Sequence, residues 1–155
     1  NTIAEHKVYL GKDAPSRARQ VVKGDDILFS TVRTYLKNIA KVPKQFDGEV
    51  ASTGFSILRA ADGVSSDYLF YFTLTSQFLN PLADLQRGTS YPAVRDNDVR
   101  DQTIPIPPLN EQRRIVAKIE ALFAELDAGV ASLKTAQAQL KTYRQALLNM
   151  PLRAN

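Results

Sequence analysis

The sequence predicts an α/β or α+β domain with a mixed sheet, followed by a long C-terminal α-helix that forms a coiled coil. Two observations lead to this prediction. Residues 1–108 alternate short apolar runs with turn residues and include helical stretches, and residues 109–150 keep an unbroken helical pattern. We therefore expect a globular domain over residues 1–108, a helix over 109–150 and a short tail over 151–155.

The first half of the domain contains the expected strands. Residues 23–26 (Lys-Gly-Asp-Asp) form a turn, and the apolar run 27–32 that follows is typical of a buried strand. Residues 38–42 predict a second strand that returns beside the first. After a turn at Asp47-Gly48, residues 53–59 alternate apolar and polar side chains, as a half-buried strand does.

The second half of the domain is expected to be mainly helical. Ser66 or Asp67 can cap a helix over residues 68–74. A second helix is expected over residues 76–85, with Pro81 near its start or at a kink.

Shorter elements connect these helices to the C-terminal helix. We expect a loop over residues 87–92, a short turn or helix over 94–99, and an edge strand over 102–106. The strand ends in a proline-rich hinge at residues 104–109 (Ile-Pro-Ile-Pro-Pro-Leu).

The C-terminal helix is too long for its own domain to cover. No proline follows the hinge until Pro151, and a helix of about 40 residues spans roughly 60 Å. A heptad template gives a seam in which eight of ten a and d positions are apolar, which predicts a coiled coil. The seam residues are Val116, Ile119, Phe123, Leu126, Val130, Leu133, Gln137, Leu140, Arg144 and Leu147. The alternative is a helix that packs on its own domain, but its length favours a helical partner from another chain or another part of the intact protein.

Catalytic chemistry has little support in this sequence. The chain has no cysteine, which excludes disulfides, thiol nucleophiles and cysteine zinc sites, and His6 is its one histidine. It contains no phosphate-binding glycine motif and no zinc-protease motif. No apolar run approaches the length of a transmembrane helix. We expect a cytoplasmic, non-catalytic protein with no metal site and no membrane partner.

The charge distribution suggests a polyanion partner for one part of the domain. Residues 1–45 carry nine basic and four acidic side chains, a net of +5, whereas residues 46–108 carry a net of −4. Three loops, residues 17–20, 31–38 and 87–91, together combine Arg and Lys with hydroxyl, amide and tyrosine side chains, the groups that contact phosphates and base edges. An ordinary solvated surface is the alternative for each loop. The candidate DNA-binding residues are Arg17, Arg19, Lys23, Arg33, Tyr35, Lys37, Asn38, Arg87, Thr89, Ser90, Tyr91 and Arg95.

Short motifs are spread over nearly the whole chain. They are residues 15–22 (PSRARQVV), 24–28 (GDDIL), 30–33 (STVR), 38–40 (NIA), 52–55 (STGF), 87–94 (RGTSYPAV), and the hinge 104–109 (IPIPPL) with 111–116 (EQRRIV). The hinge that leads into a long helix is the most specific of them. In these motifs the chain resembles the specificity (S) subunit of type I restriction–modification systems.

This resemblance implies a DNA target recognition domain followed by a spacer helix. In this family a full subunit has two recognition domains, each reading half of a split DNA sequence, and two spacer helices packed as an antiparallel coiled coil. The spacers also dock the modification (methyltransferase) subunits, which carry S-adenosylmethionine, so no cofactor is expected in this chain. The implied partners are double-stranded DNA, modification subunits, and a second spacer helix in the same subunit or in a second copy (a homodimer).

The chain differs from a full family member in extent. It has one recognition domain, which looks shortened at its front, and one helix, and it does not begin with Met. We expect either the carboxy-terminal piece of a full subunit or a half-subunit that pairs with a second copy. Arg33 and Arg87 are candidates for phosphate contacts, and no residue is assigned to a base. The alternative function is a helical assembly module without DNA reading of its own.

Overall fold

The computed structural model describes residue 3 and residues 6–149 and divides the chain into two compact units. The first unit is residues 1–116 and the second is residues 117–155, so the beginning of helix α4 (Leu109–Leu148) belongs to the globular unit. The expected tail, 151–155, and residue 150 of the expected helix lie outside the described residues.

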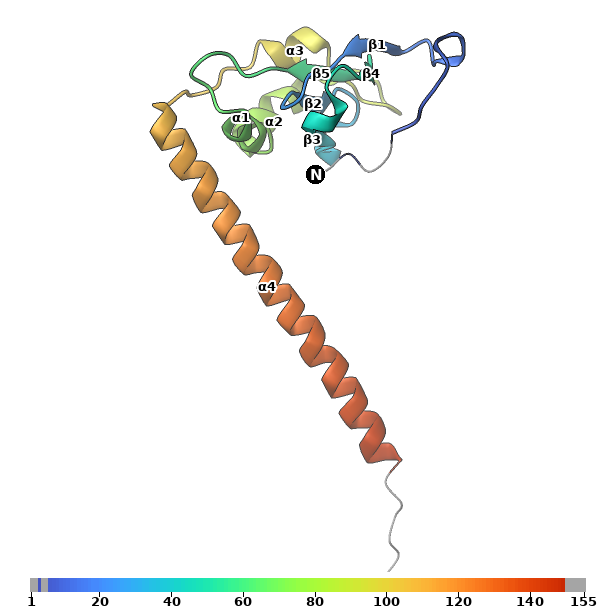
Figure 1. Cartoon of the computed structure of the whole chain (residues 1–155), viewed down its shortest axis with the longest axis vertical. Coiled ribbons are helices and arrows are strands. Elements are labelled where there is room, and N and C mark those ends of the chain that lie inside the picture. The colour runs from blue at the N-terminus through green and yellow to red at the C-terminus, as the bar shows by residue number, and fades with distance from the viewer. Residues whose placement is uncertain (1–2, 4–5, 150–155) are drawn as a thin grey trace, which may run out of the picture. The chain divides into compact units, whose positions relative to one another are not determined.

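The globular unit contains two small antiparallel sheets (Figure 1). In the larger sheet, β2 (Ile27–Ser30) lies between β3 (Ile39–Lys41) and β5 (Phe55–Leu58), which confirms the three expected strand positions. The fold class is confirmed, but the predicted mixed sheet is wrong, since all pairings of the described strands are antiparallel. No α-helix lies between paired strands to provide the crossover that parallel pairing requires.

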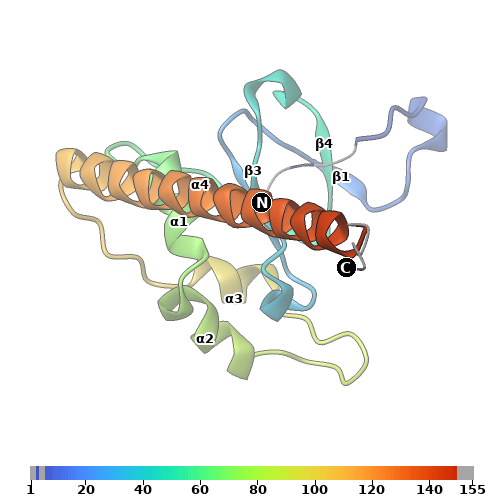
Figure 2. The same cartoon turned by 90° about the horizontal axis from the view of Figure 1, so that it is seen from below.

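The smaller sheet was not predicted from the sequence. It pairs β1 (Ala18–Val21) with β4 (Val50–Ser52) on the side of the domain away from α1 and α2 (Figures 1 and 2). Neither strand has a buried face, so the apolar alternation that marks a strand in sequence is absent. Gln20 joins the two sheets, because its side-chain Nε2 donates to the carbonyls of Ser52 at 3.0 Å and Phe55 at 2.9 Å.

The helices agree with the expected positions within a few residues. Helix α1 (Ser66–Thr73) is capped by Ser65 rather than Ser66 or Asp67, since the Ser65 hydroxyl accepts from the backbone N–H of Tyr68. Thr75 caps α2 (Ser76–Asp84) in the same way, and Pro81 lies inside this helix. The expected turn or helix at 94–99 is α3 (Asp96–Arg100). Three short 3₁₀ turns, η1 (Gly11–Asp13), η2 (Thr34–Leu36) and η3 (Lys44–Phe46), complete the domain.

The predicted edge strand at 102–106 is wrong. These residues have no strand partner and lead directly into the hinge. Pro105 lacks a backbone N–H, and Pro107 follows two residues later, so the segment cannot supply the regular donors of a strand ladder.

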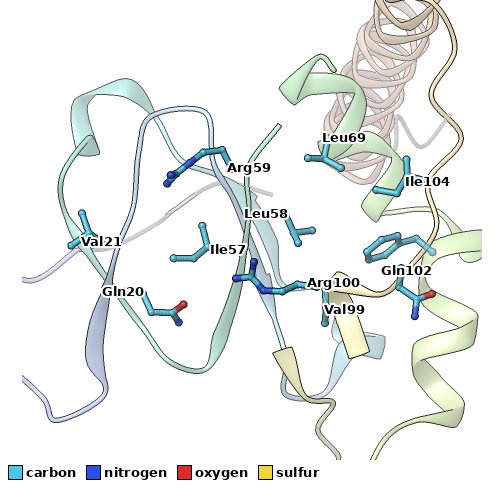
Figure 3. A pocket seen from close by; sticks show the side chains of 11 residues that line it. Gln20, Val21, Ile57, Leu58, Arg59, Leu69, Val99, Arg100, Gln102 and Ile104 are labelled. Carbon is cyan, nitrogen blue, oxygen red and sulfur yellow. The ribbon is translucent and has the colours of Figure 1, made fainter. Parts of the chain in front are cut away.

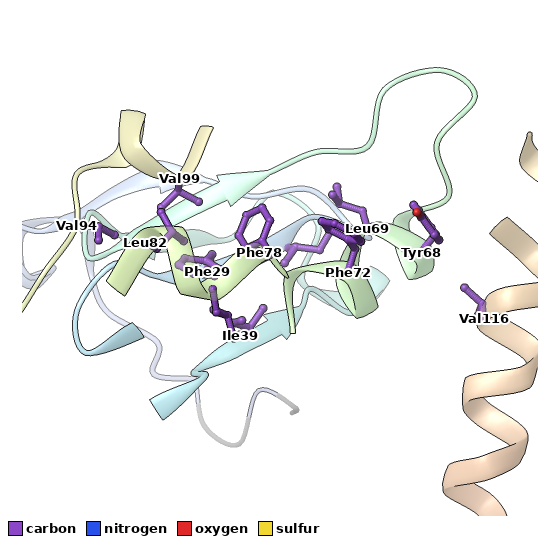
Figure 4. Close-up of a cluster of buried hydrophobic side chains, with 12 residues drawn as sticks. Phe29, Ile39, Tyr68, Leu69, Phe72, Phe78, Leu82, Val94, Val99 and Val116 are labelled. Atoms are coloured by element: carbon purple, nitrogen blue, oxygen red, sulfur yellow. The ribbon is translucent and has the colours of Figure 1, made fainter. Parts of the chain in front are cut away.

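The hydrophobic core lies between the three-stranded sheet and the helices (Figure 4). Ile27 and Phe29 alternate with partly exposed neighbours on β2 and are fully buried. The Phe29 and Phe78 rings meet edge to face, with centroids 5.6 Å apart, so β2 and α2 share one aromatic contact. Leu82 of α2 is also fully buried in this cluster.

A buried carboxylate organises the turn before β2. Asp26 is 1% exposed, and both its oxygens accept from the half-exposed Arg59 guanidinium, at 2.7 and 2.6 Å. One oxygen also accepts from the backbone N–H of Lys23 at 2.8 Å. Burial by itself acts to raise the pKa of Asp26, but the hydrogen bonds from Arg59 and Lys23 outweigh it, and the pKa is lowered.

A buried amide holds the start of α4 against the domain. Gln112 is 0% exposed, and its Nε2 donates to the carbonyls of Gly63 at 2.9 Å and Pro107 at 2.8 Å. Its Oε1 accepts from the backbone N–H of Ser65 at 2.7 Å. The side chain therefore joins the segment before α1, the hinge and α4, with both donor hydrogens in use. Val116, one turn further on, is buried in the core cluster.

The second unit begins at Ala117 and contains the rest of α4. From Ala117 to Asn149 all side chains are exposed except that of Ile119, which is partly buried. Within the described part of the chain, no helix is long and apolar enough to span a membrane.

Replacing Gln112 by Leu should destabilise the domain by about 3 kcal/mol, because it removes three hydrogen bonds and leaves one backbone N–H and two carbonyls facing a buried apolar side chain. Urea unfolding followed by circular dichroism measures the change. Gln139→Leu, at an exposed position of α4, is the control and should change the free energy of unfolding by less than about 0.5 kcal/mol. Equal stability of the two variants would contradict this assignment.

The Asp26 pair predicts a specific loss of stability in acid. Because the folded-state pKa of Asp26 is lowered, its contribution is full above the unfolded pKa, about 3.9, and is lost as the pH falls below that value. Asp26→Asn should cost about 1–3 kcal/mol at pH 7 and flatten the fall in stability between about pH 5 and pH 2. The exposed Asp62→Asn should keep the wild-type profile, and an unaltered profile in Asp26→Asn would refute the role of the pair.

Candidate nucleic-acid interface

Two of the three candidate loops lie against each other. The strand-exit loop, residues 31–38, follows β2, and the glycine loop, residues 87–93, extends from α2 and returns toward α3 (Figure 2). Val32 forms an isolated antiparallel bridge with Ala93. The backbone N–H of Val94 also donates to the Thr31 carbonyl at 2.9 Å. Loops more than 50 positions apart in sequence therefore form one surface.

Arg33 makes side-chain contacts from the first loop to the second. Its guanidinium carbon lies 4.7 Å from the centroid of the Tyr91 ring, and its Nη2 donates to the Ser90 carbonyl at 3.3 Å. The Arg33 backbone N–H donates to the Pro92 carbonyl at 2.7 Å. Arg33 and Tyr91, both candidates from the sequence, are thus direct neighbours.

A buried polar pair supports this junction. Thr34 is buried, and its hydroxyl accepts from the Gln86 side-chain Nε2 at 2.7 Å. Sequence reasoning missed Gln86, although it directly precedes the candidate loop. A polar residue next to a glycine turn is a weak signal, because such residues are common on surfaces.

Arg87 makes its contacts at the base of the glycine loop. Its Nη1 forms an ion pair with an Asp98 carboxylate oxygen at 2.9 Å, and its backbone exchanges two hydrogen bonds of 2.9 Å with Ala93. The Arg95 backbone N–H donates to Asp98. This bond, with the Arg87 ion pair, outweighs the opposing effect of burial and lowers the pKa of Asp98. Asp98 therefore remains charged at neutral pH and anchors the base of the loop.

Many candidate side chains on this surface are exposed. The exposed candidates are Tyr35, Lys37, Asn38, Arg87, Thr89, Ser90, Tyr91 and Arg95. They supply cationic, amide, hydroxyl and aromatic groups on one pair of joined loops, which is the chemistry that contacts phosphates and base edges.

The remaining candidates belong to other elements. Arg17 and Arg19 are exposed at and beside the start of β1, and the Arg19 Nε donates to the Ser16 carbonyl at 2.6 Å. Lys23 is exposed in the turn before β2. These residues belong to the smaller sheet and its following turn, and not to the joined loops.

A wide hollow lies on another part of the globular unit (Figure 3). It has a volume of about 610 Å³ and combines apolar side chains such as Ile57 and Leu58 with the polar groups of Gln20, Arg59 and Arg100. Arg59 and Arg100 are already paired with Asp26 and Asp96. Among the described residues, no group of three or more His, Cys, Asp or Glu side chains could hold a metal ion.

The predicted helical seam is exposed along most of its length. Val116 is buried and Ile119 is partly buried in this chain, whereas Leu133 is 72% exposed. The other seam residues beyond Ile119 are exposed as well: Phe123, Leu126, Val130, Gln137, Leu140, Arg144 and Leu147. The seam is thus a row of mainly large apolar side chains that lies exposed on one face of α4.

Comparison with known proteins is consistent across sequence and structure. The family described as the type I restriction modification DNA specificity domain matches residues 14–134. The EcoDI specificity subunit of Escherichia coli is 27% identical over 95% of this chain, and the EcoKI specificity subunit of E. coli K12 is 32% identical over 59% of it. The crystal structure of the HsdS subunit from Thermoanaerobacter tengcongensis superposes with a TM-score of 0.84 and 43% identity over 95% of this chain.

The chain is shorter than these relatives. It spans 29% of the EcoDI subunit, 20% of the EcoKI subunit and 39% of the T. tengcongensis chain. The family match nevertheless covers most of its residues, including the joined loops, the hinge and over half of α4. The chain therefore belongs to the family of type I restriction modification DNA specificity domains.

Proposed function

We propose that this chain recognises half of a bipartite DNA target within a type I restriction–modification complex, without catalysing a reaction itself. The joined strand-exit and glycine loops are the observation that supports this proposal most directly. They present exposed cationic, amide and hydroxyl side chains from two distant parts of the sequence on one surface. The names of the relatives, all specificity subunits of type I restriction enzymes, support the same function.

The proposed role of α4 is to pair with a second spacer helix and to dock modification subunits. The exposed seam supports pairing, because isolated helices leave such side chains in water only at a free-energy cost. The second helix belongs either to the same subunit or to a second copy of this chain. A related solved structure with a TM-score of 0.78 is described as the basis of complex assembly in a type I system, which supports an assembly role for this fold.

In this proposal the cofactor and the DNA are bound by different parts of the complex. S-adenosylmethionine belongs to the modification subunits, and DNA contact belongs to the globular domain. The basic residues of the first 45 positions supply much of the positive charge that such contact needs. We propose 1–108 as the recognition domain and 109–150 as the spacer helix, in a cytoplasmic complex.

The alternative function is a helical assembly module without DNA reading, and the exposed seam is the one observation that favours it. It does not account for the joined loops. DNA footprinting with and without modification subunits separates the two functions, because only DNA recognition predicts protection that depends on this domain.

Charge removal tests the DNA-binding surface. In the assembled complex, Arg17→Ala combined with Lys37→Ala should weaken DNA binding and reduce the slope of log K against log salt concentration by about 2. Arg114→Ala combined with Lys118→Ala removes the same charge from α4 and is the control, with assembly verified by light scattering. An unchanged slope in the first variant would remove these two residues from the interface.

Disruption of the seam tests helix pairing. Leu126→Asp combined with Leu133→Asp should shift the chain toward monomer at least tenfold in dissociation constant, since two apolar contacts are replaced by buried charges. Ala131→Asp with Ala138→Asp adds the same charge off the seam and is the control. Analytical ultracentrifugation over a dilution series measures the dissociation constants of both variants. A wild-type chain that stays monomeric with a fully ordered helix would argue against the seam as a pairing surface.

A further inference from the structure

We propose that Arg33 is a positioning residue that holds the tip of the glycine loop, residues 88–92, against the strand-exit loop and so sets which DNA sequences the domain accepts. The inference rests on the proposed function of this surface. It assigns Arg33 a role that acts through a neighbouring loop, in contrast to a direct phosphate contact.

The first argument is the direction of the Arg33 contacts. Its side chain and backbone reach three consecutive residues of the tip: the Ser90 carbonyl, the Tyr91 ring and the Pro92 carbonyl. The side chain is only partly exposed, and its Nε is buried without a hydrogen-bond partner. A guanidinium that lies over the Tyr91 ring, uses Nη2 for the Ser90 carbonyl and has a buried Nε is poorly placed to pair a phosphate through both of its edges.

The second argument is the backbone of the strand-exit loop. Arg33 has φ 51° and ψ 57°, the left-handed conformation, and Lys37 at the other end of η2 is left-handed as well. A non-glycine residue in this region costs about 1–2 kcal/mol. Strain of this kind persists where surrounding contacts hold the residue. The Arg33 carbonyl accepts from the Leu36 N–H at 2.9 Å within its own loop, and the Arg33 backbone N–H and side chain contact the glycine loop.

The third argument is the shape of the glycine loop. Arg87 and Ala93 close its base with two hydrogen bonds, and Gly88 has φ +93°. A Cβ at Gly88 would lie 3.2 Å from the Tyr91 carbonyl oxygen, so the tip folds tightly back on its first residue. The tip side chains Thr89, Ser90 and Tyr91 are exposed. Because the base is closed and the tip is exposed, Arg33 decides where these groups are presented.

Hydrogen exchange of the assembled complex without DNA tests the positioning role independently of DNA binding. In Arg33→Lys, the backbone amides of residue 33, Ala93 and Val94, which donate to the Pro92, Arg87 and Thr31 carbonyls, should exchange about five- to thirtyfold faster. Lysine keeps the charge but lacks the planar group that lies over Tyr91 and reaches Ser90. Arg33→Gly adopts the left-handed backbone without strain and should show the same faster exchange, which separates the contacts from the strain. Arg17→Lys, on the smaller sheet, is the matched control and should leave these amides unchanged.

Methylation of a random-sequence duplex library by the complex tests the consequence for recognition. Arg33→Lys and Tyr91→Ala should relax or alter the preferred bases at the same positions of one half-target, and their double variant should show no larger change than either alone. The salt slope of DNA binding should stay within about 0.3 of wild type for Arg33→Lys. Gly88→Ala, which strains the same tip, should change selectivity at these positions too.

Three outcomes would overturn the proposal. Unchanged exchange at residue 33, Ala93 and Val94 would show that Arg33 does not hold the tip. Normal selectivity in Arg33→Lys, with a salt slope reduced by about 1 in Arg33→Ala, would make Arg33 a phosphate contact. Faster exchange with unaltered selectivity would remove the tip from recognition. The proposed function itself fails separately, if replacing the whole domain with that of a relative leaves the wild-type sequence preference unchanged.

Discussion

The Gln112 amide is the interaction on which the organisation of the domain's C-terminal side depends. From the first turn of α4, this one side chain hydrogen-bonds the segment before α1 and the hinge, and it does so in a fully buried position. Hydrogen bonds in such an environment are strong, and an unpaired partner there is costly. The hinge prolines cannot form a regular ladder. Gln112 donates instead to the Pro107 carbonyl, and the Tyr68 hydroxyl donates to the Pro105 carbonyl.

The opposite side of the domain depends on contacts between loops. The strand-exit loop and the glycine loop have no long regular elements, and they are joined by an isolated bridge, by Gln86 with buried Thr34, and by Arg33 with Tyr91. A rigid sheet and helical core thus carries a surface whose polar groups are exposed but whose backbone is fixed. This combination is typical of binding loops on a stable scaffold.

Sequence patterns predicted the elements that have a buried face. Ile27 and Phe29 mark β2, and the apolar side chains of α1 and α2 mark these helices, because burial imposes a period on the chain. Helix α4 was predicted from its unbroken helical pattern, although its apolar seam is exposed beyond Ile119 in this chain. β1 and β4 were missed because neither has a buried face, and the expected strand at 102–106 was wrong because prolines interrupt it. The candidate residues of the two loops were predicted because their side chains are of the kinds that bind nucleic acid. Gln86 was missed because it gives no periodic signal.

The sequence by itself determined the fold class, the hinge, the long helix with its apolar seam and the absence of cysteine chemistry, since each depends on local composition or periodicity. Only the tertiary structure decided which polar residues meet. It brought Arg33 into contact with Tyr91, Arg87 with Asp98, and Gln112 with Ser65. The members of these pairs are 58, 11 and 47 positions apart in the sequence, respectively. Such pairings arise from the packing of distant segments, and no local pattern encodes them.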